Sequence, residues 1–145
     1  MIVSLTKTVT DDELGAMIDA SMAENLPGLE RELGKRDAGF WTGATGRLVL
    51  RLLACQATGM GRKRAASYFI TKRGVPINFV PEDELALAKK CPDVQHNHRN
   101  LTPLLISTIS GYDEMPLHVL SLQPDADLEL GRVVGKLEYK CKALH

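Results

Sequence analysis

The chain has 145 residues, of which 44% are hydrophobic and 25% charged, and its formal net charge is zero. This length supports one domain with a substantial core, and the zero net charge excludes a protein that is basic over its whole surface. The charges are unevenly distributed: residues 1–40 carry 4 basic and 8 acidic side chains, residues 41–100 carry 10 and 4, and residues 101–145 carry 4 and 6. We therefore expect a single domain over 1–145 with one positive surface, unless these charges merely solvate separate faces.

Three cysteines, Cys55, Cys91 and Cys141, leave at least one thiol unpaired. This usage favours a reduced, intracellular protein. The N-terminus lacks a basic region before a long apolar run, so we expect no signal peptide. No apolar stretch approaches the length of a membrane span, so we expect a cytoplasmic protein without a membrane partner.

The N-terminal third predicts two helices. Residues 1–9 are β-branched and partly alternating, which leaves a short strand and an extended arm both open. Thr10 then resembles an N-cap, because acidic residues fill the first turn and Glu13 stands at the capping-box position. Apolar residues at helical spacing predict a helix over 11–25, and Pro27 predicts the start of a second helix.

The most informative stretch runs from Thr45 to Gly74. Residues 46–57 are apolar on nearly every face, which is typical of a buried central helix. Arg47 and Arg51 interrupt this helix and share one side at i,i+4 spacing. Before it, residues 39–46 predict a loop whose aromatic pair, Phe40 and Trp41, we expect to anchor the core.

The rest of the chain predicts short helices and an extended segment at 75–80. The expected helices after the central one cover residues 62–73, 81–90, 101–110, 116–122 and 125–143. The last has a stripe of apolar side chains: Leu130, Val133, Val134, Leu137, Cys141 and Leu144. The sequence thus predicts an all-α, compact globular bundle of about six to seven helices around a buried central helix, with little or no strand.

The strongest functional signal is a basic cluster, which we define as Arg62, Lys63, Arg64, Lys72 and Arg73. Several cations at once suit a phosphate backbone, because each contact releases counterions and adds to the affinity. Tyr68 lies among them, and bases of single-stranded nucleic acid stack on aromatic side chains. The candidate nucleic-acid-binding residues are Arg47, Arg51, Arg62, Lys63, Arg64, Tyr68, Lys72, Arg73 and Arg99. The alternative function is a helical interaction module whose basic face binds an acidic protein.

A metal site and an enzyme are less favoured. Cys91, His96 and His98 give three zinc ligands, and Cys141 or His145 a fourth, but the spacing matches no zinc motif. A solvated loop that extends the basic surface explains this segment better, so we expect no metal and no cofactor. No catalytic signature is present, and a Cys–His nucleophile has no local support in the sequence, so we expect no enzyme.

Residues Asp12 to Gly74 resemble the N-terminal lobe of nucleocapsid proteins of the phlebovirus and tenuivirus type. The resemblance lies in the order of an acidic helix (DELGAMIDASMAENL), a second helix (PGLERELGKRD), Trp41 in a glycine-rich loop, a buried helix (GRLVLRLL) and a basic segment (GRKRAASYFITKRG). It covers about half of the chain. It implies a viral protein that binds single-stranded RNA, in the cytoplasm and the virion. The RNA groove would be lined by Arg62, Lys63, Arg64 and Lys72, and an arm, Ile2 to Val9, would join neighbouring subunits of a homo-oligomer.

Overall fold

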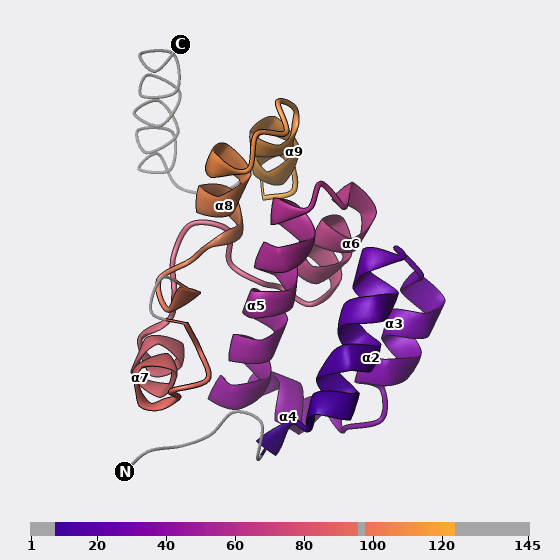
Figure 1. Ribbon diagram of the computed structural model, residues 1–145, viewed down its shortest axis with the longest axis vertical. Coiled ribbons are helices and arrows are strands. Elements are labelled where there is room, and N and C mark those ends of the chain that lie inside the picture. Colours follow the sequence, from indigo (N-terminus) through magenta and orange to yellow (C-terminus); the bar gives the residue numbers. More distant parts are fainter. Residues whose placement is uncertain (1–7, 96–97, 124–145) are drawn as a thin grey trace.

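The computed structural model of the protein describes residues 8–95 and 98–123. These residues form α-helices and one π-helical turn, η1, with no strand among them, so the predicted all-α fold is confirmed (Figure 1). The elements in chain order are α2 (Asp11–Met22), α3 (Leu26–Leu33), α4 (Ala38–Thr42), α5 (Ala44–Gly59), α6 (Lys63–Ser67), η1 (Tyr68–Lys72), α7 (Glu82–Lys90), α8 (Pro103–Ile109) and α9 (Met115–Ser121).

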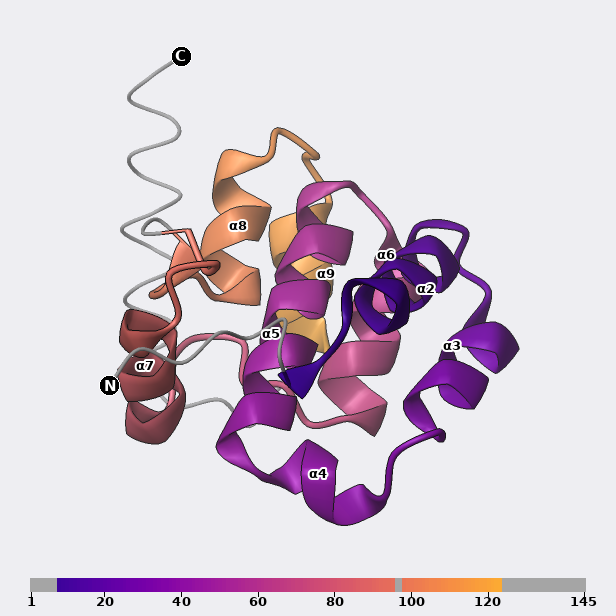
Figure 2. The ribbon, with the colours of Figure 1, turned by 60° about the horizontal axis from the view of Figure 1, so that its bottom comes forward.

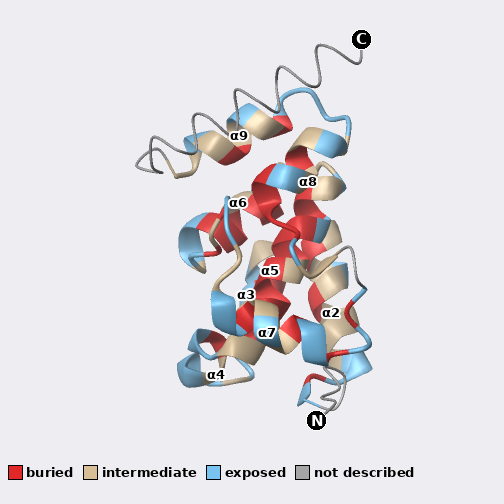
Figure 3. Cartoon of the chain, turned by 90° about the vertical axis from the view of Figure 1, so that its left-hand side faces the viewer, coloured by how far each residue is buried: buried red, intermediate tan, exposed pale blue. Residues whose placement is uncertain are grey.

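The predicted central helix is α5, and it is buried along most of its length. Leu48, Val49, Leu50 and Leu53 are each at most 3% exposed. The other helices surround α5, with α2 and α6 on one side of it and α7 on the opposite side (Figures 1 and 2). Coloured by burial, α5 forms a buried column through the molecule (Figure 3). Because α5 contacts α2, α4, α6, η1, α7 and α8, it positions most of the fold.

Local sequence signals fix the ends of α2 and α3. The Oγ1 of Thr10 accepts a hydrogen bond from the backbone N–H of Glu13, as the N-cap prediction requires. Helix α2 ends at Met22, before the predicted boundary, because Glu24 adopts a left-handed conformation with φ of 54°. Asn25 then caps α3 by accepting from the N–H of Gly28.

The predicted loop before α5 is wrong in part, because residues 38–42 form the short helix α4. Asp37 caps this helix by accepting from the N–H of Phe40. Trp41 is buried and donates its indole N–H to the carbonyl of Leu33 at 2.8 Å, which confirms its role as a core anchor. Gly46 permits the tight corner between α4 and α5, since a Cβ there would lie 2.2 Å from the Phe40 carbonyl oxygen.

The predicted basic helix over 62–73 is present as α6 followed by the wider turn η1. Gly61, with φ of 73°, reverses the chain after α5, and the ring of Tyr112 packs against it. Phe69 is fully buried and belongs to the main core. After η1, residues 75–81 connect to α7 without helix or strand.

Helices α8 and α9 pack together over a small second core made of Ile70, Ile77, Leu104, Met115 and Val119. Helix α8 is buried only in part, since Leu105 is 38% and Ile109 66% exposed. The segment before α8 differs from the polar loop that the sequence predicts. Cys91 and Val94 are buried there and complete the main core.

Two predicted elements lie outside the described residues: most of the arm at 1–9, and the helix at 125–143. Of the arm, Thr8 and Val9 are described, and Val9 is fully buried in the main core. Within the described part of the chain, every helix is too short or too polar to cross a membrane.

Candidate nucleic-acid interface

The basic cluster lies on one short stretch of chain, from the start of α6 to the end of η1. The inner face of this stretch is apolar and packs into the core through Ala65, Ala66 and Phe69. Arg64 and Lys72 are exposed, and the remaining three cations are partly exposed. The fold therefore keeps the five cations together and directs the two most exposed ones to solvent.

An acidic residue from another element holds the first turn of α6. No side chain of the adjacent residues caps this helix, but a carboxylate oxygen of Glu24 accepts from the N–H of Arg64 at 2.7 Å and of Ala65 at 3.2 Å. A negative group is favourable there, because the first N–H groups of a helix lack partners and carry partial positive charge. Glu24 thus fixes the basic cluster relative to the junction of α2 and α3.

One cation of the cluster has a carboxylate partner among the described residues. The Nζ of Lys63 lies 2.6 Å from a carboxylate oxygen of Glu114, which precedes α9. The ammonium group lowers the pKa of Glu114 below its usual range. Both side chains are well exposed, so this ion pair contributes little stability and is readily exchanged for another anion.

Tyr68 does not lie where the sequence analysis places it. Its side chain is only 5% exposed, because it faces the main core beside Phe69. Its hydroxyl accepts from the Nε of Arg73 at 3.1 Å, and the Arg73 guanidinium lies 5.8 Å from the ring centroid. Tyr68 therefore positions Arg73, and the prediction that it stacks on a base is wrong.

The prediction that Arg51 binds nucleic acid is also wrong, since its side chain is fully buried. Its Nε donates to Glu84 at 3.1 Å, and its Nη1 and Nη2 donate to the carbonyls of Leu101, His98 and Arg99. With every donor group engaged inside the protein, Arg51 cannot reach a phosphate. It links α5 to α7 and to the segment before α8.

Arg47 and Arg99 do not extend the basic cluster either. Arg47 forms ion pairs with Asp83 and Glu84 at the start of α7, on the opposite side of α5 from α6 (Figure 2). Burial raises the pKa of Glu84, and the two arginines partly offset this effect, whereas Arg47 lowers the pKa of Asp83. Arg99 is half-buried in the segment that Arg51 holds.

Burial disfavours the thiolate form of the two cysteines that the structure describes. Burial raises the pKa of Cys55 to about 12, and its thiol donates to the carbonyl of Leu101. Burial also raises the pKa of Cys91. The reactive form of cysteine is the thiolate, so neither residue is activated. Of the residues considered as zinc ligands, His96, Cys141 and His145 lie outside the described residues, and the described part holds no cluster of three metal-binding side chains.

Sequence reasoning missed the acidic residues that organise this surface, Glu24 and Glu114. No local pattern marks them, because each acts on a segment about 40 to 50 residues away in the chain.

In comparisons with known proteins, no family model, curated protein or solved structure matches the chain.

Proposed function

We propose that this protein binds single-stranded RNA through the basic cluster of α6 and η1, as a self-associating protein of the nucleocapsid type. The observation that carries the proposal is the concentration of charge. Five cations occupy twelve residues, and within residues 8–95 and 98–123 the only ion pair they form is the exposed one between Lys63 and Glu114. Such a surface favours a polyanion, because several phosphates neutralise it at once and release their counterions.

Three contacts hold the segment that carries this surface in place, which lowers the entropic cost of binding. Phe69 anchors the segment in the core, Glu24 caps its first turn, and Tyr68 orients Arg73. Contacts of this kind go to the phosphates and carry no sequence information. We therefore infer binding that is largely independent of RNA sequence, as a protein that coats a strand in the cytoplasm or a virion requires.

Self-association completes the proposed function. Residues 1–40 carry more acidic than basic side chains, whereas residues 41–100 carry more basic ones. The acidic surface of α2 and α3 in one copy is thus complementary to the basic middle of another. Residues 1–7 are the part of the predicted arm that is left to join neighbouring subunits.

An acidic protein partner is the second candidate for the same surface. The ion pair between Lys63 and Glu114 favours it, since the cluster already accepts a carboxylate from its own chain. A partner protein would offer carboxylates, which Arg64 and Lys72 can bind equally well. RNA is preferred because a phosphate backbone supplies closely and regularly spaced charges along a strand.

The experiment compares two double charge reversals in the full chain by fluorescence anisotropy with labelled single-stranded RNA. Arg64→Glu with Lys72→Glu is expected to abolish binding, because both side chains are exposed and make no ion pair within the described residues. The matched control is Lys89→Glu with Lys90→Glu, which reverses two exposed lysines at the end of α7 and should retain most of the affinity. Equal loss in both variants would contradict a localised interface. A parent protein that does not bind RNA but binds an acidic polypeptide would establish an acidic protein as the partner of the basic cluster.

A further inference from the structure

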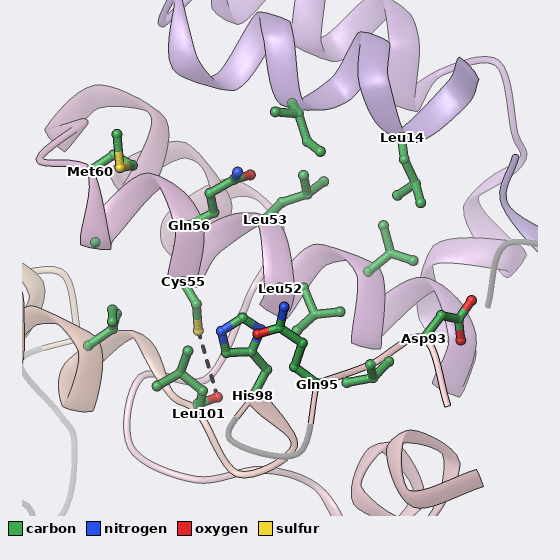
Figure 4. Close-up of a pocket in the computed structure, with 15 residues that line it drawn as sticks. Leu14, Leu52, Leu53, Cys55, Gln56, Met60, Asp93, Gln95, His98 and Leu101 are labelled. Carbon is green, nitrogen blue, oxygen red and sulfur yellow. Dashed lines mark hydrogen bonds between the residues drawn. The ribbon is translucent and has the colours of Figure 1, made fainter. Parts of the chain in front are cut away.

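Two pockets beside α5, in the part of the chain that the structure describes, differ in what lines them. The larger has a volume of about 520 Å³, lies between α2, α5 and the segment from Asp93 to Leu101, and is lined mainly by apolar side chains (Figure 4). None of the five cations of the basic cluster lines it. The smaller has a volume of about 210 Å³, and Arg73, the last cation of the cluster, forms part of its wall. The smaller pocket, which we call the Arg73 pocket, is therefore continuous with the proposed RNA surface.

The interior of the Arg73 pocket is apolar. Trp41 of α4, Leu50 of α5 and Val75 after η1 line it, and each is at most 5% exposed. Pro76 and Pro81 line it from the connection between η1 and α7, whose course can be followed in Figure 2. The volume is below the roughly 300–1,000 Å³ of sites that enclose a whole drug-sized ligand, so the pocket fits a single ring system.

Arg47 holds the walls of the Arg73 pocket together. Its Nε donates to the carbonyl of Thr42 at 2.9 Å, and its Nη1 donates to Glu84 at 3.3 Å, which joins α4, α5 and α7. Glu84 also lines the pocket and is 1% exposed, so it lies at the inner end. Among the described side chains, its Oε2 accepts from Arg47 alone, and a carboxylate oxygen can accept a second hydrogen bond. The inner end therefore offers an acceptor to an N–H group of a ligand.

Arg73 can hold a phosphate beside this pocket. Its Nε donates to the hydroxyl of Tyr68 at 3.1 Å, whereas its two Nη atoms make no hydrogen bond or ion pair with another described residue. A guanidinium binds phosphate through parallel N–H groups of this kind. Because a phosphate and a base of one nucleotide are joined through a single sugar, a phosphate on Arg73 brings a base to the pocket.

We propose that the Arg73 pocket takes one unpaired base of the strand that the basic cluster binds, an inference that rests on the proposed function. Every RNA base carries an N–H donor on the edge that pairs in a duplex: an amino group in adenine and cytosine, and a ring N–H in guanine and uracil. Glu84 can accept from this edge whichever base enters, but only when the base is unpaired. The pocket therefore makes the protein select single strands over duplexes without preferring a sequence.

The fluorescence of Trp41 tests whether a base enters the pocket. Trp41 is the only tryptophan of the chain and lines the pocket, so its emission reports on this site. Guanosine monophosphate should quench it, because a base packed against an indole quenches its emission. Excitation at the red edge of the indole band avoids absorption by the base. Ribose 5-phosphate, which has the phosphate but no base, should leave the emission unchanged, and equal quenching by both compounds would overturn the proposal.

Filling the pocket should abolish this quenching. Pro76→Phe places a bulky side chain in the lining, and Thr42→Phe repeats the test from the α4 side. The matched control is Asn78→Phe, at an exposed position of the same connection that does not line the pocket. Far-ultraviolet circular dichroism checks that each variant folds. Quenching that is equal in all three variants would overturn the proposal.

Fluorescence anisotropy with labelled single-stranded RNA and a duplex of the same length tests the selectivity. The ratio of single-strand affinity to duplex affinity should fall about tenfold in Pro76→Phe, as expected for the loss of one bound base, and stay at the parent value in Asn78→Phe. A parent that binds RNA while Pro76→Phe keeps the parent ratio would overturn the base pocket and leave the proposed function standing. A parent that binds no RNA, but whose Trp41 is quenched by guanosine monophosphate, would contradict the proposed function and support a base in the pocket.

Discussion

At the scale of single residues, Arg51 shows that a buried charge stabilises the fold, whereas an exposed charge is available to a ligand. Its spacing from Arg47 is read correctly from the sequence, because both side chains do share one side of α5 and both reach Glu84. That side faces α7 and the interior, not solvent. The partner lies 33 residues further along the chain. No local pattern identifies such a partner, so the sequence could not distinguish a buried arginine from an exposed one.

Arg51→Met is expected to lower the free energy of unfolding by about 3–5 kcal/mol, since it leaves the buried carboxylate of Glu84 without its main partner. The double variant Arg51→Met with Glu84→Met should recover part of this loss, because it removes both charges. Chemical denaturation measures both values. Lys89→Met, an exposed control, should stay within about 0.5 kcal/mol of the parent.

The stability lost in Arg51→Met should depend on pH in a direction that the pKa of Glu84 determines. Burial raises the folded-state pKa of Glu84 above its ordinary value of 4.5. The contribution of Glu84 to the free energy of unfolding is therefore fully present below pH 4.5 and is lost as the pH rises through the raised pKa. Without Arg51, this pKa rises further. The stability difference between parent and Arg51→Met should therefore widen towards neutral pH and narrow in acid. A difference that is constant with pH would mean that Glu84 is not the group left uncompensated.

At the scale of elements, capping residues and apolar periodicity locate most helices correctly. Thr10 caps α2 as the sequence predicts, and Asn25 and Thr102 also act as caps in the structure, of α3 and α8. The same local order explains why the five cations of the basic cluster stay together on α6 and η1. Helix α4 was missed because five residues are too few for a periodic signal. Tyr68 was misplaced because the exposure of an aromatic side chain depends on which elements cover it.

Helix α5 should be the centre of stability. Leu53→Ala removes buried methylene groups and leaves a cavity between α5 and its neighbours, which should cost about 2–5 kcal/mol in the free energy of unfolding. Glu30→Ala, at an exposed position of α3, should change it by less than about 0.5 kcal/mol. Thermal melts that coincide for parent and Leu53→Ala would show that α5 is not the core of the fold.

At the scale of the whole molecule, the uneven charge was visible in the sequence, but the limits of the arm were not. Val9 is fully buried in its own domain, and the Thr8 carbonyl accepts from Arg36 at 2.7 Å. The arm proposed to join neighbouring copies is therefore restricted to residues 1–7. The end of the arm at residue 7 is set by tertiary contacts of Thr8 and Val9, and the sequence of the N-terminus does not reveal such contacts.

Deletion of residues 1–7 should lower the mass measured by light scattering without changing the far-ultraviolet circular dichroism spectrum. The fold should survive, because the deletion leaves Thr8, Val9 and the N-cap of α2 in place. A mass equal to that of the parent, at the same concentration and salt, would show that self-association does not use this segment.

The salt dependence of RNA affinity tests the central claim most directly. The parent should bind single-stranded RNA at low salt, and the logarithm of its affinity should fall linearly with the logarithm of the salt concentration. Each cation of the basic cluster changed to alanine should reduce that slope by about 0.7, the value expected for one lost phosphate contact on a single strand. A parent that does not bind at low salt, or a slope unchanged by Arg64→Ala and Lys72→Ala, would contradict the account.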